Sequence, residues 1–292
     1  MPIETHGKYR PMIERFDNVQ AFTTAMRKEK GISASQTSGG YSAANGDCSW
    51  SGASDLAGAL NDCDNGNCGN ALKEAETLMS EIQAQGLMSE HVMRWGPNVV
   101  GAIPLIPNAI QGVPDTMLAP MWEAQSARGP IRVFYDCVGS AGISERDMAK
   151  RGTAVLAFVL LMSQVRPVEL FVIAGMQGTG GACIPIVKIE TAPLDTKSSL
   201  YALACTAFSR EIAFAWGYSS DAAGTRRGFH GGWAWGTAPN QDGTGRWHDA
   251  MRTVLDIQPD DLLIPGAVYG DPIVKDPIAW LQREIDMRAA HE

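Results

Sequence analysis

The clearest secondary-structure pattern in the sequence lies in residues 131–174, IRVFYDCVGSAGISERDMAKRGTAVLAFVLLMSQVRPVELFVIA. Its first six residues are rich in β-branched and aromatic side chains and end at a turn with glycine and serine, which is typical of a strand. Ser144 has the position of a helix N-cap before an apolar stretch that runs to Ser163. Residues 168–174 form a second apolar, β-rich run. A strand, a crossover helix and a strand of this size predict a right-handed βαβ unit with parallel strands and helices on both faces.

The alternation of strand and helix patterns continues toward the C-terminus. Residues 184–190 predict a third strand, residues 198–216 a second long helix, and residues 262–266 a last strand. Asp276 and Pro277 have the residue types of an N-cap and a first helical position, so a terminal helix begins there. The predicted fold class is therefore α/β: a three-layer core in which a largely parallel or mixed sheet is flanked by helices.

The N-terminal third predicts helices. Apolar residues three and four apart over residues 8–30 indicate a basic amphipathic helix that is interrupted near Pro11. Ser54 is a candidate cap for a helix through Asn61, and a further helix is expected over residues 70–85.

The chain is accordingly divided into three parts. Residues 1–95 are expected to be a mostly helical region packed on the core. Residues 96–130 contain six prolines, which predict an edge strand or a wrapped connection. Residues 131–292 are the expected α/β core, with an Arg/Gly/Trp-rich loop at 224–248.

The composition indicates a folded cytoplasmic protein. Hydrophobic residues make up 45% of the chain and charged residues 19%, far from the signature of disorder. The N-terminus lacks the features of a secretory signal, and the apolar stretch from Thr153 to Met162 is roughly half the length that a membrane span requires. The six cysteines lack the spacing of a tight ligand pair, so we expect reduced thiols. No membrane association is expected.

The net charge of −8 argues against a protein that coats duplex DNA, because phosphate binding needs clustered lysine and arginine. The charge is uneven along the chain. Residues 1–30 carry six bases and four acids, whereas residues 253–292 carry eight acids and three bases. A nucleic-acid footprint would therefore have to be local.

The turn after the first core strand lies where open α/β sheets place their ligand sites. Its residues 136–140 resemble the D-x-S-x-S metal-adhesion motif of von Willebrand A-like domains, with Asp136 and Ser140 in the matching positions. Val138 replaces the middle hydroxyl and so removes one cation ligand. Asp136 and Ser140 are the candidates for a divalent cation, but a capping role at the turn and the following helix is favoured, and no metal is expected.

A glycine-rich loop, residues 175–181, follows the second strand. It lacks the Gly-Lys-Ser/Thr ending of a phosphate-binding loop, and a strand rather than a helix comes after it. A hairpin-like loop is therefore predicted.

Arginine, aromatic residues and glycine interleave between residues 224 and 248. Aromatic rings can stack on the bases of single-stranded nucleic acid, while arginine binds phosphate. The alternative is that the tryptophans fill the core or an oligomer interface. The candidate nucleic-acid-binding residues are Arg226, Arg227, Phe229, His230, Trp233, Trp235, Arg246 and Trp247.

The five histidines do not come with a recognisable catalytic motif. No G-x-S-x-G elbow, H-E-x-x-H or C-x-x-C pattern is present. A hydrolase that uses His230 or His248 is the third option, but the sequence favours a protein that is not an enzyme and needs no cofactor.

Three features together resemble the single-stranded-DNA-binding RNA polymerase cofactors of bacteriophages. They are Ser49-Trp50-Ser51-Gly52 before a helix, the unit 131–174, and Val268-Tyr269-Gly270 after an aromatic, arginine-containing stretch. The resemblance implies a non-catalytic protein that binds single-stranded DNA and supports transcription by a phage RNA polymerase in the host cytoplasm. A homo-oligomer is expected, because an acidic protein gains avidity on a strand by multimerising. The alternative function is a von Willebrand A-like adaptor that binds a protein partner through the Asp136/Ser140 face.

Overall fold

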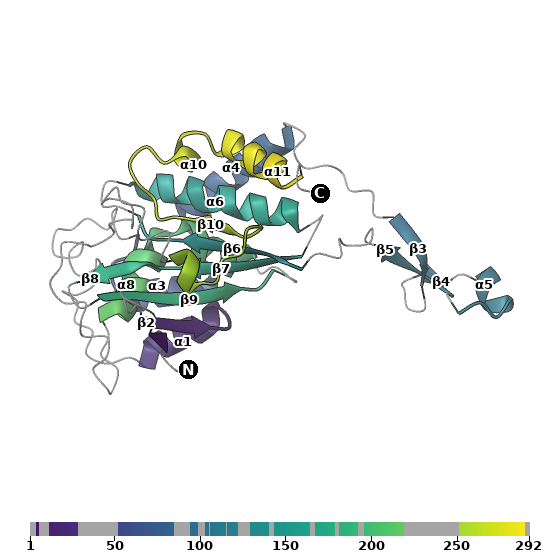
Figure 1. Ribbon diagram of the computed structural model, residues 1–292, viewed down its shortest axis with the longest axis horizontal. Coiled ribbons are helices and arrows are strands. Elements are labelled where there is room, and N and C mark those ends of the chain that lie inside the picture. The colour runs from purple at the N-terminus through teal and green to yellow at the C-terminus, as the bar shows by residue number, and fades with distance from the viewer. Residues whose placement is uncertain are drawn as a thin grey trace.

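The βαβ unit expected from residues 131–174 is present in the computed structural model (Figure 1). Strand β6 (Ile131–Asp136) leads through helix α6 (Glu145–Met162) to strand β7 (Val168–Ile173). The two strands pair in parallel, from Ile131 opposite Val168 to Asp136 opposite Ile173. The Ser144 hydroxyl accepts a hydrogen bond from the Asp147 amide at 3.1 Å, so the predicted N-cap is confirmed.

The structure describes thirteen segments, which carry all structural statements below. They are residues 4–5, 12–28, 52–84, 94–98, 103–104, 106–114, 116–121, 129–139, 143–163, 167–178, 181–191, 196–218 and 251–289.

The central sheet is mixed. Strand β10 (Leu262–Ile264) pairs in parallel with β6 on the side away from β7, and β9 (Gly181–Ile189) pairs antiparallel with β7. Strand β8 (Met176–Gly178) folds back on β9 as a hairpin, which confirms the expectation for the glycine-rich loop. The order is β1-β2-β9-β7-β6-β10, with β8 beside β9. The predicted α/β fold with a mixed sheet is therefore confirmed.

The N-terminal segment adds two strands to this sheet. Strand β1 (Glu4–Thr5) pairs with β2 (Met12–Phe16), and β2 pairs in parallel with β9. Helix α1 (Val19–Lys28) begins only after Asn18, whose side chain accepts from the Ala21 amide at 2.7 Å. The predicted helix over residues 8–30 is therefore wrong for residues 12–16, because backbone pairing with β9 fixes them as a strand.

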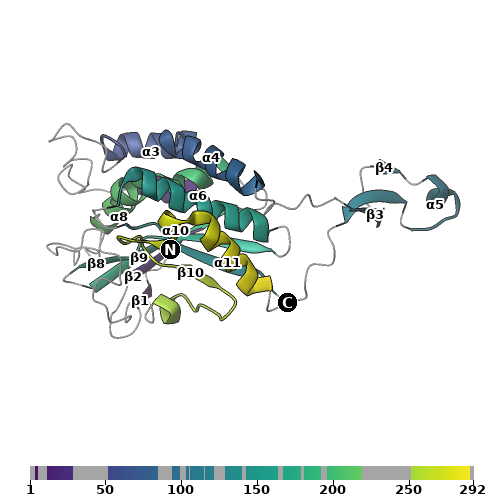
Figure 2. The same ribbon diagram turned by 90° about the horizontal axis from the view of Figure 1, so that it is seen from above.

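Two tiers of helices cover one face of the sheet (Figure 2). The inner tier contains α6 and the run that follows β9, and the outer tier contains the helices of residues 56–84. The C-terminal pair packs on α6 on the side away from this outer tier. The inner run is α7 (Thr196–Ala204), the π-helix η2 (Phe208–Ala213) and α8 (Phe214–Tyr218). The outer helices are α3 (Leu56–Asn65) and α4 (Asn70–Ala84), and the C-terminal pair is α10 (Pro272–Lys275) and α11 (Pro277–Ala289).

Capping residues explain where α3 and α11 begin. Asp55 caps α3 by accepting from the Gly58 amide at 2.6 Å, so the expected cap at Ser54 lies one residue too early. Asp276 accepts from the Ala279 amide at 2.9 Å, as predicted for the terminal helix. The predicted helix over residues 198–216 is interrupted, because α7 ends at Ala204 and a π-helix follows.

The two faces of the sheet are covered very differently. The large hydrophobic cluster lies under α6, α7 and η2 and includes Tyr135, Phe158 and Trp216. The opposite face has a smaller cluster, in which Phe134 and Ile184 pack against Met251 and Leu255. Among the described residues, that face is covered by the short segment 251–257. No helix in the described part of the chain is long and apolar enough to cross a membrane.

Residues 94–121 form a second, three-stranded sheet with a short helix (Figure 1). The described strands of this sheet pair only with one another. The region is therefore a small sheet of its own, whereas its prolines indicated a single edge strand or a connection. Ile106 and Ile110 are exposed on its helix. Its elements are β3 (Arg94–Asn98), β4 (Ile103–Pro104), α5 (Ile106–Ile110) and β5 (Met117–Met121).

Candidate functional site

The carboxyl ends of β6, β7 and β10 meet at one edge of the sheet. Strand β6 has β7 on one side and β10 on the other, and all three run in parallel. The chain therefore leaves β6 toward one side and returns on the other, the arrangement that opens a ligand crevice in α/β proteins. We call this region, residues 136–139, 174–175 and 265–271, the carboxyl edge.

The carboxyl edge is held together by backbone contacts between its segments. Gly139 forms a parallel bridge with Ala267, and the Ala267 amide donates to the Val138 carbonyl at 2.8 Å. A Cβ on Gly139 would lie 3.0 Å from the Met148 sulfur, so the close packing on α6 favours glycine. The turn after β6 is thereby fixed against the turn after β10.

Asp136 is the last residue of β6 and is only 2% exposed. Its Oδ1 accepts from the Val138 amide at 3.1 Å and from the Gly175 amide at 3.3 Å. Burial raises the pKa of Asp136 to about 7, although these two amides and Arg151 act in the opposite direction. The carboxyl group fastens the turns after β6 and β7 to each other.

Arg151 is the buried cation behind this edge. It lies on α6, is fully buried, and its Nε donates to Asp271 Oδ2 at 2.9 Å. Its other nitrogens donate to the carbonyls of Asp136, at 3.0 Å, and of Pro265. The guanidinium also lies 4.8 Å from the centre of the Tyr135 ring. Burial acts to lower the pKa of Arg151, but Tyr135, Asp271 and Asp136 outweigh it and raise the pKa.

Tyr269 is presented on the surface of this braced edge. It is 95% exposed, two residues before the buried Asp271. The Asp271 amide donates to the Val268 carbonyl at 3.0 Å, and Gly270 has a φ of 80°, which defines a tight turn with glycine in its third position. Asp271 also caps α10 by accepting from the Ile273 amide at 2.8 Å. A large aromatic ring is thus exposed to solvent on a fixed backbone.

The described residues at Asp136 do not fit a divalent cation. The carboxylate already accepts two amide hydrogens, a buried arginine lies close by, and Val138 supplies no oxygen from its side chain. No cluster of three or more metal-ligating side chains occurs in the described segments. Asp136 caps a turn, as the favoured interpretation of the sequence holds, whereas Ser144 caps the helix. Ser140 lies outside the described residues.

The predicted nucleic-acid-binding residues cannot be placed. All eight of them, from Arg226 to Trp247, lie between residues 219 and 250, outside the described segments. The described ends of this interval are anchored on opposite faces of the sheet. Trp216 donates from Nε1 to Glu14 at 2.8 Å in the large cluster, and Met251 is buried in the smaller one.

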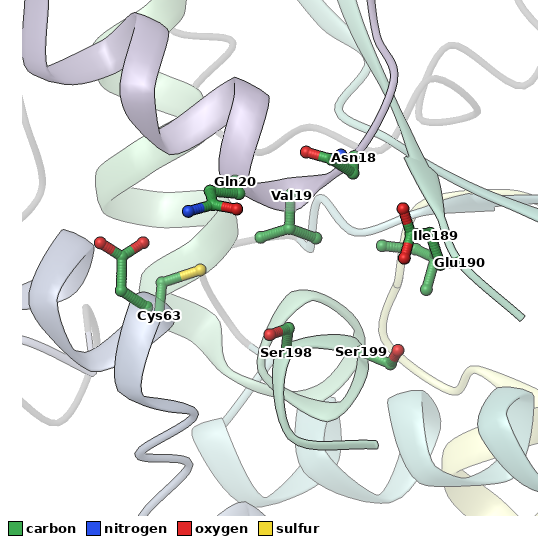
Figure 3. A pocket seen from close by; sticks show the side chains of 9 residues that line it. Asn18, Val19, Gln20, Cys63, Ile189, Glu190, Ser198 and Ser199 are labelled. Carbon is green, nitrogen blue, oxygen red and sulfur yellow. The ribbon is translucent and has the colours of Figure 1, made fainter. Parts of the chain in front are cut away.

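A polar cavity of about 340 Å³ lies at the other end of the sheet (Figure 3). Strand β9 runs antiparallel to β7, so its carboxyl end lies beside the amino end of β7. Asp64 at this cavity already accepts from Thr23 at 3.0 Å and pairs with Arg27 at 2.6 Å. The hydrogen-bonding groups that line the cavity suit a small polar ligand. They come from Asn18, Gln20, Asp64, Glu190, Ser198 and Ser199.

Sequence reasoning missed Arg151, and it named Tyr269 only as part of a family resemblance, without a role at a site. Arg151 follows Arg146 and Lys150 in the charged first half of α6, so its sequence context resembles that of a solvated helix face and did not mark it as a buried cation. Tyr269 precedes Gly270 and the Asp271-Pro272 helix start, a turn with an aromatic residue at its tip. Asp136 was a candidate site residue in the sequence, and the structure places it at the carboxyl edge.

Comparison with known proteins gives one family. Residues 4–279 match the family model described as domain of unknown function DUF7192, which spans nearly the whole chain, the carboxyl edge included. No curated protein and no solved structure matches the chain. The chain belongs to the DUF7192 family.

Proposed function

We propose that this chain is a non-catalytic adaptor that binds a protein partner through the carboxyl edge. The observation that carries the proposal is Tyr269, an almost fully exposed aromatic side chain on a turn that a buried ion pair and a backbone bridge hold in place. Tyrosine is enriched among the residues that dominate binding energy at interfaces. A fixed backbone lowers the entropy lost on binding.

The fold supports the same location. Ligands of open α/β sheets bind outside the carboxyl ends of the strands, where the strand order reverses. Tyr269 follows β10 at that reversal, and Asp136 ends β6 there. Since Asp136 is buried and committed to two amides, its role is to position the edge, and binding is expected to be insensitive to chelators.

Single-stranded DNA is the second candidate ligand, in the role of a cofactor of a phage-encoded RNA polymerase in the host cytoplasm. It is favoured by the arginine and aromatic residues of 224–248 and by the family resemblance. The net charge of −8 favours the protein partner over a polyanion.

Photo-crosslinking from one position tests the proposal. Tyr269 is replaced by a benzophenone-bearing phenylalanine in cells that contain the natural partners, with the same replacement at exposed Leu72 of α4 as the matched control. We expect an adduct from position 269 that protease digests and nuclease leaves intact, and none from position 72.

Other outcomes separate the candidates. A nuclease-sensitive adduct from position 269 would show that the carboxyl edge binds nucleic acid and not a protein partner. Equal adducts from both positions would contradict the proposal. Fluorescence-anisotropy titration with single-stranded and duplex oligonucleotides at two salt concentrations tests the DNA candidate separately, because phosphate contacts weaken strongly with salt.

A further inference from the structure

Three cysteines that are far apart in sequence gather where the turn between α3 and α4 meets the end of α7. Cys63 and Cys68 belong to α3 and this turn, and Cys205 directly follows α7. The turn packs tightly on α7, since a Cβ on Gly66 would lie 2.4 Å from the Lys197 Cβ. The fold therefore brings residues 68 and 205 together across 137 positions of sequence.

Cys68 and Cys205 are direct neighbours. The Cys205 Sγ lies 3.7 Å from the Cys68 carbonyl oxygen, and the Cys68 Sγ lies 3.7 Å from the Lys197 carbonyl oxygen. Both cysteines are free thiols. Cys205 is partly exposed and Cys68 is 7% exposed, whereas Cys63 and Cys137 are buried in the core.

The chemistry of the three thiols differs. Hydrogen bonding with the Cys205 thiol lowers the pKa of Cys68, and the same interaction together with burial raises the pKa of Cys205. Burial and the nearby Asp64 raise the pKa of Cys63. Because the thiolate is the reactive form, these interactions favour Cys68 as the nucleophile and Cys205, its direct neighbour, as the thiol that resolves it.

We propose that Cys68 and Cys205 form a peroxide-sensitive modification site that closes to a reversible disulfide. The Cys68 thiolate attacks hydrogen peroxide, an S–O bond forms as the O–O bond breaks, and hydroxide leaves. The Cys205 sulfur then attacks the Cys68 sulfur, the S–O bond breaks, and water leaves with the Cys205 proton. The thiol pair loses two electrons and the peroxide gains them.

The two cysteines lie close to the π-helix, which contacts the start of α6. Cys205 lies three residues before η2, and Arg210 of η2 donates from Nη2 to the Ile143 carbonyl at 2.8 Å. Ile143 directly precedes the cap of α6. The cysteine pair is therefore a separate site from the carboxyl edge, whichever ligand that edge binds.

Peptide mapping of the intact protein tests this site. The reduced protein is treated with hydrogen peroxide, alkylated, and digested on the amino side of aspartate, which places all six cysteines in different peptides. We expect peptides 64–114 and 195–220 to be joined, with the loss of two hydrogen atoms and release by dithiothreitol. In Cys205→Ser we expect dimedone, which traps sulfenic acid, to label peptide 64–114.

The matched control is Cys63→Ser, which removes the third thiol of the group and should leave the 68–205 crosslink intact. A disulfide that joins any other pair, a crosslink between two chains, or six unlinked cysteines after treatment would overturn the proposal. The readout is covalent, so it is independent of partner binding.

Discussion

Two layers of the carboxyl edge, separated by two residues of sequence, have opposite character. Asp271 is buried and pairs with the fully buried Arg151, whereas Tyr269 is 95% exposed. The buried layer holds three turns together through Arg151 and Asp136, and the exposed layer presents one aromatic ring. Stability and binding should therefore be separable here: changes in the buried layer should reduce stability, and changes in the exposed layer should reduce binding alone.

The largest effect is expected from Arg151→Met. Removing the guanidinium leaves the Asp271 carboxylate buried without its cation and frees the carbonyls of Asp136 and Pro265. Breaking a buried ion pair on one side lowers the free energy of unfolding by roughly 3–5 kcal/mol. Urea denaturation measures this loss.

Arg146→Met is the control for that change. The Arg146 side chain is 71% exposed and pairs with Glu74 at 2.8 Å, so its loss should lower the free energy of unfolding by about 0–1 kcal/mol. Equal losses from the two variants would show that the Arg151 network does not brace the edge.

The next effect is a pH dependence that comes from Asp136. Its pKa is about 7 in the folded protein against an ordinary value of 3.8, so the folded state binds more protons between these pH values. Stability from this group is therefore present below pH 4 and is lost as the pH rises to about 7, by roughly 1.4 kcal/mol for each pKa unit.

Asp136→Asn should remove that loss, because the amide oxygen can still accept from Val138 and Gly175 without a buried charge. We expect the variant to be more stable than the wild type at pH 8 and to differ little at pH 4. Urea melts of both proteins across this range make the comparison. An unchanged slope between pH 4 and 7 in the variant would assign the dependence to other groups.

A smaller effect is expected from Gly270→Ala. The positive φ of 80° strains any residue with a Cβ, and the variant should lose about 1–2 kcal/mol of stability. Gly129→Ala is the control, because a Cβ there meets no atom within 4 Å and the residue has no positive φ. Thermal unfolding of the two variants tests whether the turn that carries Tyr269 is held as described.

The sequence was informative where one local pattern determines one element. The β-rich run 131–136, the Ser144 cap and the apolar stretch after it predicted β6, α6 and their parallel partner β7. Asp276-Pro277 likewise predicted the start of α11. Periodicity failed over residues 12–28, because a short strand followed closely by a helix continues the same apolar spacing of three and four.

The features that the sequence did not predict depend on contacts between residues that are distant in sequence. Strand β9 follows β7 through a hairpin and runs antiparallel to it, which no pattern within residues 184–190 specifies. A π-helix interrupts the helical pattern after Cys205 without a sequence break. The ion pair of Arg151 joins residues 120 positions apart, so only the folded chain reveals that Tyr269 stands on a braced turn.

The most direct test of the central claim is the affinity of Tyr269→Ala for the partner captured at position 269, measured beside its thermal unfolding. An exposed side chain contributes within about 0.5 kcal/mol to stability, so the melting temperature should not change. Binding should weaken by about tenfold or more, as expected for a residue that dominates an interface, while Leu72→Ala binds like the wild type. Unchanged affinity in Tyr269→Ala would contradict the assignment of the carboxyl edge as the binding surface.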